Sequence, residues 1–288
     1  MSTDYSDHRL AIIGAGVMGT NISALATGHG VPVVLVDVSD DVLAEAKKTI
    51  RGKLRHAQLM GALPEGRTPG TLVTTTSLDD VADATTVVEA VTEVAEVKAK
   101  VLAGVSAVVR PGTTLISNTS CIPISELAES VTHPGDLVGV HFMNPAYLIK
   151  MVEVIRGPAT SETILTAVTG LLTALGRESL VINDSAGFVI NRLLHPLINT
   201  AAMLVEEGVA SAEVVDGLLE GCLGHATGPL RTGDLIGLDN LVDSLNVLYE
   251  RRGDESCRPC ELLLSKVREG NLGRKSGRGF YDYGKEAS

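Results

Sequence analysis

The chain has 288 residues, of which 44% are hydrophobic, and its formal net charge is −11. This length and hydrophobic content suffice for a large buried core, which excludes global disorder and predicts two domains. The acidic balance, without a long basic tract, argues against nucleic acid as a partner. No segment resembles a membrane span, and the polar, acidic N-terminus is not a signal peptide, so we expect no membrane association. Four cysteines in so aliphatic a chain indicate a reduced, cytoplasmic protein.

The first elements form a strand, a glycine-rich turn, a helix and a second strand. The apolar run 9–13 stops at Gly14-Ala-Gly16-Val-Met18-Gly19, a helical pattern follows, and the strand 32–36 ends in Asp37. This order is the full fingerprint of a dinucleotide-binding turn. The glycines permit a tight turn and a close approach of the pyrophosphate to the helix N-terminus. Asp37 suits the ribose hydroxyls and repels a 2′-phosphate, so we expect NAD rather than NADP.

The later elements divide the chain. Trp is absent and aromatic residues are only 3%, so the core must be aliphatic, as in a parallel sheet flanked by helices. Further strands are expected at 72–75, 86–89, 114–117, 137–141, 152–155 and 180–183, and helices at 42–55, 97–108 and 161–175. Beyond Asp184 the expected elements are all helical, at 188–207, 213–219, 238–250 and 259–269. We therefore predict an α/β protein with an N-terminal Rossmann-type, mostly parallel sheet (residues 1–184) and a C-terminal all-helical domain (185–288). The apolar helix faces of the second domain predict a homodimer.

One histidine and one carboxylate carry the chemistry. His141 ends the apolar run 137–141, and Glu153 lies within the next run, Lys-Met-Val-Glu-Val-Ile. A neutral imidazole accepts a proton near pH 7, and a carboxylate behind it fixes the tautomer and stabilises the imidazolium. A base of this kind beside a cofactor that takes hydride predicts an alcohol dehydrogenase.

Other polar clusters are more ambiguous. Asn118 and Ser120 follow the strand 114–117 at the edge where parallel sheets bind ligands, although Ser120 would also serve as a helix N-cap. The basic stretch with Lys48, Arg51, Lys53 and Arg55 is either a solvated helix end or a landing patch for phosphates or an acidic carrier. We interpret Cys257 and Cys260 as part of a surface loop entering a helix. No second pair completes a metal site, so no metal is expected.

Taken together, these motifs resemble those of the L-3-hydroxyacyl-CoA dehydrogenase family, in the short form often called 3-hydroxybutyryl-CoA dehydrogenase. The resemblance covers nearly the whole chain and rests on the order and spacing of several motifs. They are Gly14–Gly19, Val88–Glu93, Ser117–Ser120, His141–Pro145, Lys150–Glu153, Gly187–Arg192, Gly228-Pro-Leu, Asp234–Asp239 and Leu272–Tyr281.

The resemblance implies a role for each matching residue. It makes His141 the catalytic base, Glu153 its partner, and Ser120 and Asn191 the residues that bind the substrate oxygen. The cofactor pocket or its edge is implied to include Glu93, Lys98, Asn118, Asn144 and Lys275. The implied fold is a Rossmann-type domain followed by a helical dimerisation domain. The implied reaction is NAD-dependent oxidation of the 3-hydroxyl of a hydroxyacyl thioester, or its reverse.

Several departures surround the acyl pocket. Val94 follows Glu93 where the family commonly has Asn, Cys121 follows Ser120 where it has Ser, and Pro145-Ala-Tyr147 replaces Pro-Val-Pro. These changes leave the acyl group and its carrier open. One alternative is an enzyme of polyketide extender-unit biosynthesis that acts on a substrate tethered to acyl carrier protein, and His225-Ala-Thr-Gly-Pro resembles the sequence of that branch. The others are a free hydroxy-acid dehydrogenase of the gulonate type and a non-catalytic NAD-binding protein.

Overall fold

The computed structural model describes residues 9–284. The chain divides into two compact units, one ending at Ser185 and the other beginning at Ala186. The first unit is an eight-stranded sheet with helices, and the second is built from helices, so the predicted fold class is confirmed. No helix within residues 9–284 is long and apolar enough to cross a membrane.

The sheet of the first unit has the strand order β3-β2-β1-β4-β5-β6-β7-β8. Its neighbours are parallel except for β6 and β7, which are antiparallel. The strand order reverses at β1, because β2 and β3 lie on one side of β1 and β4 lies on the other. Open α/β sheets bind their ligands at such a reversal. The strands are β1 (Leu10–Ile13), β2 (Val33–Val36), β3 (Leu72–Thr75), β4 (Thr86–Glu89), β5 (Thr114–Ser117), β6 (Leu137–His141), β7 (Met151–Arg156) and β8 (Glu178–Asn183).

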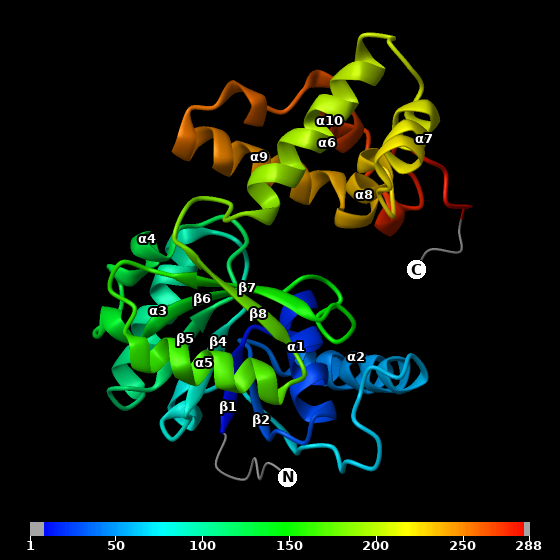
Figure 1. Cartoon of the computed structure of the whole chain (residues 1–288). Coiled ribbons are helices and arrows are strands. Elements are labelled where there is room, and N and C mark those ends of the chain that lie inside the picture. The colour runs from blue at the N-terminus through cyan, green and yellow to red at the C-terminus, as the bar shows by residue number, and fades with distance from the viewer. Residues whose placement is uncertain (1–8, 285–288) are drawn as a thin grey trace. The chain divides into compact units, whose positions relative to one another are not determined.

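Helices lie against both faces of this sheet (Figure 1). The helices α1 (Val17–Gly28), α2 (Asp40–Leu59) and α5 (Glu162–Ala174) contribute to one core with alternate strand residues such as Ile12 and Leu35. The helix α3 (Ala95–Val108) contacts β4, and the short α4 (Ile124–Ala128) contacts β6. Because β1 is buried along its whole length, it can be uniformly apolar.

The helix α2 is longer than the sequence predicts. Ser39 caps its N-terminus by accepting a hydrogen bond from the backbone N–H of Val42, and Asp40 and Asp41 occupy the first turn. Both features stabilise a helix start, the second through the helix dipole. The helix therefore begins before residue 42 and continues beyond 55, so its basic stretch lies within the helix rather than at its end.

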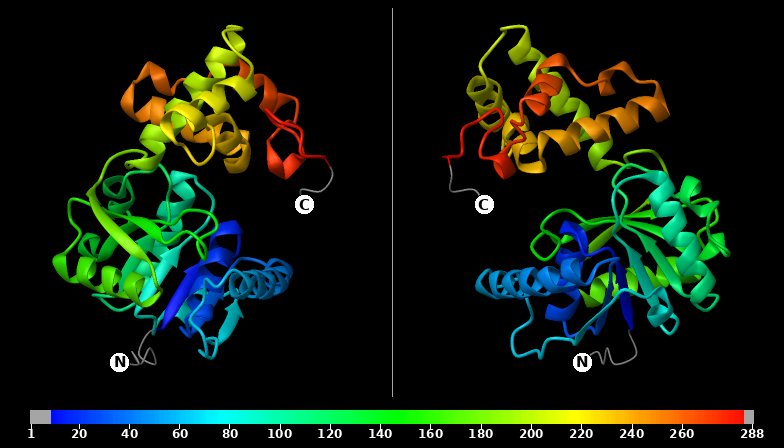
Figure 2. Two further views of the ribbon diagram at one scale, coloured as in Figure 1. Left: turned by 45° about the vertical axis from the view of Figure 1, so that its right-hand side comes forward. Right: turned by 180° about the vertical axis from the view of Figure 1, so that it is seen from behind.

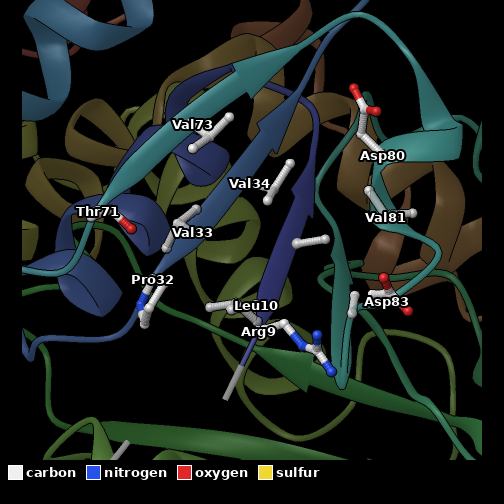
Figure 3. A pocket seen from close by; sticks show the side chains of 12 residues that line it. Arg9, Leu10, Pro32, Val33, Val34, Thr71, Val73, Asp80, Val81 and Asp83 are labelled. Atoms are coloured by element: carbon white, nitrogen blue, oxygen red, sulfur yellow. The ribbon is translucent and has the colours of Figure 1, made fainter. Parts of the chain in front are cut away.

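The outer strands leave part of one sheet face open. Val34 and Val73 line a hollow over β2 and β3, together with residues of the 3₁₀ turn Leu78–Val81 (Figure 3). The chain passes from β3 to β4 through this short turn instead of a full helix.

In the described part of the second unit, 186–284, all regular secondary structure is helical apart from two isolated β-bridges near its end (Figure 2). Its helices are α6 (Ile190–Glu206), α7 (Ala212–Leu223), α8 (Pro229–Ile236), α9 (Leu238–Arg252) and α10 (Glu261–Arg268). The sequence analysis did not predict α8. The interpretation of Cys257 as part of a surface loop is wrong, because Cys257 is buried in the core that Ile198 and Leu245 also form.

The helix α8 receives its N-terminal cap from another helix. Asp216 of α7 accepts hydrogen bonds from the backbone N–H groups of Leu230 (2.8 Å) and Arg231 (2.9 Å) and from the hydroxyl of Tyr281 (2.7 Å). Asp216 is almost completely buried. One carboxylate thus satisfies two N–H groups that a helix start leaves without partners, and it connects α8 to the C-terminal segment.

A second buried carboxylate, Asp234, holds the same C-terminal segment. It accepts hydrogen bonds from the backbone N–H groups of Phe280 (2.9 Å) and Tyr281 (3.0 Å) and from the hydroxyl of Tyr283 (3.0 Å). Burial, together with the nearby Asp234 carboxylate, raises the pKa of Tyr283 to about 12. Tyr283 therefore remains a hydrogen-bond donor at any physiological pH.

Asp216→Asn should destabilise the second unit, because one amide cannot accept from three donors and its NH₂ group would face N–H groups. We expect the free energy of unfolding to fall by roughly 2–4 kcal/mol. Urea unfolding followed by tyrosine fluorescence measures this loss. Asp243→Asn, on the exposed face of α9, is the control and should leave the transition unchanged. Equal stability of the two variants would contradict the proposed capping role.

Candidate active site

The antiparallel pairing of β6 and β7 brings His141 and Glu153 together. The two residues are direct partners in the strand register, so their side chains emerge on the same face. His141 Nδ1 lies 2.7 Å from Glu153 Oε2, and the two residues are only 5% and 7% exposed. The carboxylate accepts the Nδ1 proton, which fixes the tautomer and leaves Nε2 as the basic nitrogen. This geometry is that of a histidine base oriented by a carboxylate.

A polar loop follows β5, and its backbone is held by Glu93. One oxygen of Glu93, Oε1, accepts hydrogen bonds from the Thr119 hydroxyl (2.6 Å) and from the backbone N–H groups of Ser120 (2.7 Å) and Cys121 (2.9 Å). Asn118 Oδ1 accepts a hydrogen bond from the backbone N–H of Phe142, the residue after His141 (3.2 Å). The loop that carries Ser120 is therefore fixed in place and connected to the segment that follows the histidine.

Lys98 of α3 is buried between two carboxylates. It is 1% exposed, and its Nζ lies 2.8 Å from Glu89 Oε1 and 3.2 Å from Glu93 Oε2. Glu89 is fully buried at the end of β4, and its other oxygen accepts a hydrogen bond from the Ser117 hydroxyl (2.6 Å). A buried charge is costly unless it is paired and hydrogen-bonded, and here one cation pairs with two anions.

This cluster sets the charge of Glu93. Burial alone would raise the pKa of Glu93, but the charge of Lys98, the Thr119 hydroxyl and the two backbone N–H groups lower it below the usual glutamate value. Glu93 therefore stays ionised and continues to hold the Ser120 loop. Because Lys98 Nζ is enclosed by the two glutamates, the lysine acts on its surroundings through Glu93.

The glycine-rich turn after β1 has the shape that a dinucleotide requires. Gly14 has a φ of +102°, and a Cβ there would lie 2.7 Å from the carbonyl oxygen of Ala90. A Cβ at Gly19 would lie 1.8 Å from the carbonyl oxygen of Gly14. Gly16, in contrast, is exposed with no neighbouring atom within 4 Å of a Cβ position, and no side chain caps α1. The first N–H groups of α1 are thus open to an anion.

The remaining predicted cofactor residues of this unit lie around that turn. Asp37, at the end of β2, accepts hydrogen bonds from the backbone N–H groups of Ala15 and Val38, both at 2.7 Å. Asn144 Oδ1 accepts a hydrogen bond from Asn21 Nδ2 of α1 (3.2 Å), and Met18 packs half-buried against the core. The turn, Asp37 and the polar loops all follow the carboxyl ends of β1, β2, β4, β5 and β6, and therefore share one edge of the sheet.

Two predicted site residues belong to the second unit. Asn191 is buried in the first turn of α6. Lys275 is exposed, and its Nζ lies 2.6 Å from Asp239 Oδ2.

The basic stretch of α2 is only partly paired. Lys48 Nζ lies 2.9 Å from Glu45 Oε2, whereas Arg51 and Arg55 are exposed. Lys53 Nζ lies 5.9 Å from the ring centroid of Tyr147, and burial lowers the pKa of Lys53. The face of α2 that carries Lys53 thus reaches the loop after His141.

Sequence reasoning missed two residues of this site. Glu89 was not predicted as a site residue, although it lies in the motif Val88–Glu93. A glutamate at the end of a strand otherwise made of Thr and Val indicates a buried carboxylate with a partner. Asn21, fully buried in α1, had no comparable signal. Within residues 9–284, no group of three or more His, Cys, Asp or Glu side chains could hold a metal ion.

Comparisons with known proteins assign the family. Residues 9–185 match the model of the 3-hydroxyacyl-CoA dehydrogenase NAD-binding domain, and residues 187–283 match that of the 3-hydroxyacyl-CoA dehydrogenase C-terminal domain. A probable 3-hydroxybutyryl-CoA dehydrogenase of Deinococcus radiodurans is 41% identical over 278 residues, which cover 96% of this chain and 100% of the relative. The 3-hydroxybutyryl-CoA dehydrogenase of Bradyrhizobium diazoefficiens is 40% identical over 278 residues, covering 96% of this chain and 95% of the relative.

Solved structures agree with this assignment. The crystal structure of (S)-3-hydroxybutyryl-CoA dehydrogenase from Ralstonia eutropha has a TM-score of 0.87 and 36% identity, and the match covers 96% of this chain and 99% of that one. The fold, the site and these matches define an NAD-dependent oxidoreductase. The chain belongs to the 3-hydroxyacyl-CoA dehydrogenase family.

Glu93→Gln should destabilise the first unit in a pH-dependent manner. The folded-state pKa of Glu93 lies below its unfolded value, so the ionised carboxylate adds stability above the ordinary glutamate range. This contribution is lost as the pH falls through the lowered pKa. The variant should therefore be less stable than the wild type at neutral pH, and the difference should shrink below about pH 4.3, the ordinary glutamate value.

Thermal unfolding of the cofactor-free protein from pH 7 down to pH 3 gives this comparison. Glu65→Gln, at an exposed loop position, is the matched control. A stability difference between Glu93→Gln and the wild type that stays constant over this range would refute the assigned charge state.

Proposed function

We propose that this protein interconverts the 3-hydroxyacyl and 3-oxoacyl forms of a short-chain thioester, with coenzyme A as the carrier. The buried pair of His141 and Glu153, 2.7 Å apart at the ligand-binding edge of the sheet, is the observation that carries this proposal. The names of the relatives from Deinococcus radiodurans and Bradyrhizobium diazoefficiens support the short acyl group and the CoA carrier.

His141 performs the proton transfer. In the oxidative direction, its Nε2 removes the proton of the 3-hydroxyl, and Glu153 stabilises the resulting imidazolium through Nδ1. In the reductive direction, the imidazolium returns this proton to the developing alkoxide. NAD, when bound, supplies the hydride acceptor for oxidation, and its reduced form supplies the hydride for the reverse reaction.

Two further residues hold the substrate oxygen. We assign Ser120, on the loop that Glu93 fixes, and Asn191, in the first turn of α6, to hydrogen bonds with the oxygen at C3 of the substrate. Both assignments rest on the family resemblance. The three hydrogen bonds that Glu93 accepts from this loop support the first, because a fixed loop places the serine hydroxyl without further loss of entropy.

The glycine turn and its surroundings hold the cofactor. The open N-terminus of α1 at Gly16 receives the pyrophosphate, and Asp37 has lone pairs left for the ribose hydroxyls. Glu93 and Asn144 line the pocket, and Lys98 keeps Glu93 charged rather than binding the cofactor itself. We include Gly14, Met18, Gly19, Asn118 and Lys275 in the pocket or its edge by resemblance.

The basic face of α2 is the proposed contact for the carrier. Lys48, Arg51, Lys53 and Arg55 supply positive charge in a chain of net charge −11, which suits the phosphates of CoA. The same charges suit an acidic acyl carrier protein. We therefore retain the tethered substrate of polyketide extender-unit biosynthesis as the second candidate.

No disulfide joins the four cysteines, which supports a cytoplasmic enzyme.

We further propose a homodimer formed through the second unit. Large apolar side chains are exposed on two contacting helices, among them Leu193 and Met203 of α6 and Val214 and Leu218 of α7. A second copy of the chain would remove these side chains from water. A monomer in sedimentation equilibrium at micromolar concentration would contradict this proposal.

His141→Ala should lower kcat by about 100- to 10,000-fold, because the proton transfer loses its base. The affinity for NADH should survive, since the glycine turn and Asp37 are unchanged. Steady-state kinetics with acetoacetyl-CoA and a fluorescence titration with NADH measure the two effects. His133→Ala, at an exposed histidine, is the control. A kcat near that of the wild type would disprove the role of His141.

Gly16→Ala should weaken NADH binding without unfolding the protein. The added methyl group meets no protein atom within 4 Å but enters the space at the N-terminus of α1. We expect at least a tenfold weaker Kd, about 1.4 kcal/mol, with an unchanged midpoint of thermal unfolding. Gly52→Ala, also without a neighbour within 4 Å, is the matched control and should bind NADH normally. Normal binding by Gly16→Ala would place the pyrophosphate elsewhere.

The substrate class is decided by NADH oxidation at 340 nm with three forms of one acyl group. We expect acetoacetyl-CoA to be turned over fast and free acetoacetate hardly at all, with NADPH as the cofactor control. Turnover of acetoacetyl acyl carrier protein alone would establish the second candidate. Turnover of free keto acids alone would favour a gulonate-type dehydrogenase. Binding of NADH without turnover of any form would indicate a non-catalytic protein.

A further inference from the structure

The segment 142–150 connects the two members of the proposed catalytic pair. It begins directly after His141 and ends three residues before Glu153, so its path determines how β6 and β7 meet. It contains no regular secondary structure. Its own backbone supplies only two hydrogen bonds, from the N–H groups of Leu148 and Ile149 to the carbonyl of Pro145. Its conformation therefore depends on contacts with other elements.

Three such contacts come from the side of the helices and the β5 loop. Asn118 and Asn21 bond to Phe142 and Asn144, as described above. In addition, the Tyr147 hydroxyl lies 3.1 Å from Nδ1 of His56 on α2. These contacts hold the first part of the segment and one side chain of its middle. The carbonyl of Lys150 accepts a hydrogen bond from the backbone N–H of Glu178 (2.9 Å), which leaves the carbonyls of Ala146 and Ile149 to be satisfied by another group.

Arg177, immediately before β8, satisfies those carbonyls. One guanidinium nitrogen, Nη1, donates hydrogen bonds to the carbonyl oxygens of Ala146 (3.1 Å) and Ile149 (2.9 Å). Nε donates a hydrogen bond to the carbonyl of Leu175 (3.1 Å), two residues earlier in the connection between α5 and β8. The side chain thus joins the segment 142–150 to the residues immediately before β8.

This arginine is buried without a carboxylate partner. It is 5% exposed, and within residues 9–284 no Asp or Glu side chain forms an ion pair with it. Its surroundings even include a second basic side chain, His29, whose pKa is lowered first by burial and further by the charge of Arg177. Taking a cation out of water is costly, and carbonyl dipoles offset this cost less well than a carboxylate does. Stability alone is a weak reason for a charge at this position.

We propose that Arg177 is a positioning residue of the reaction, which fixes the segment 142–150 and thereby the distance and orientation between His141 and Glu153. The proposal rests on the function proposed above for this pair. Two strands joined by an irregular segment can shift against each other. Arg177 prevents this shift by donating hydrogen bonds to two carbonyls of the segment from its position immediately before β8.

The test compares Arg177→Met with a matched arginine. Arg67→Met is the control, because Arg67 also donates to a main-chain carbonyl, that of His29 (2.9 Å). We expect Arg177→Met to lower kcat with acetoacetyl-CoA by about 10- to 100-fold, the cost of a small misplacement of reacting groups. The KM for the thioester and the Kd for NADH should change little. Equal kcat values for the two variants would overturn the proposal.

A purely structural role predicts a different result. It would lower the midpoint of thermal unfolding, while the fraction of protein that remains folded would keep its wild-type kcat. Chemical rescue separates the two roles further. In Arg177→Ala, free guanidinium at concentrations that leave the wild type folded should restore part of kcat, whereas methylammonium should restore less. Absence of rescue, together with a wild-type kcat per folded molecule, would contradict positioning.

Hydrogen–deuterium exchange reads the segment directly and does not depend on turnover. The amides of Leu148 and Ile149 should exchange faster in Arg177→Met than in the wild type or in Arg67→Met. If the wild type has no activity on any thioester, the proposed function fails, but faster exchange still shows that Arg177 holds the segment. If exchange is unchanged, the positioning role fails while the proposed function stands on the His141 variant.

Arg177→Lys gives the answer if Arg177→Met does not fold. Lysine keeps the charge but is shorter and lacks the Nε donor, so it cannot span from Leu175 to both carbonyls of the segment. We expect a loss of kcat smaller than that of a neutral residue, accompanied by faster exchange at Leu148 and Ile149. A wild-type kcat together with wild-type exchange in Arg177→Lys would overturn the proposal.

Discussion

The antiparallel contact between β6 and β7 is the constraint on which the proposed chemistry depends. In a parallel sheet, every strand brings its carboxyl end to the ligand-binding edge. Reversal of β7 places Glu153 directly opposite His141 within one ladder. The ladder thus sets the register of the pair, and both side chains are withdrawn from water.

The rest of the site is arranged around buried charge. Lys98 joins Glu89, which ends β4, to Glu93, which holds the loop after β5. One cation thus connects the ends of two neighbouring strands at the edge where the glycine turn also lies. Such a cluster resists deformation, because moving either carboxylate leaves a buried charge without its partner. Rigid polar side chains are what a site needs when orientation provides much of the rate.

The sequence predicted the fold class and the glycine turn, because each leaves a local pattern, and it singled out His141 and Glu153, whose catalytic role is our proposal. Periodicity marked the strands, and glycine spacing marked the turn. What it could not predict depends on distant partners. The contacts of Lys98 with Glu89 and Glu93 are one example, because nothing in its neighbourhood in the chain reveals them. The helix α8 was missed because its N-terminal cap, Asp216, lies on another helix, and Cys257 was misjudged because burial of a short C-x-x-C segment depends on packing against α6 and α9.

The two buried aspartates of the second unit have a consequence for folding during synthesis. Asp234 needs the backbone of Phe280 and Tyr281, and Asp216 needs the hydroxyl of Tyr281, so α7 and α8 cannot complete their hydrogen bonds until the ribosome has released that stretch. The first unit requires no residue beyond Ser185 for its own sheet and can fold while translation continues. The helical unit completes these hydrogen bonds only after Tyr281 has left the ribosome.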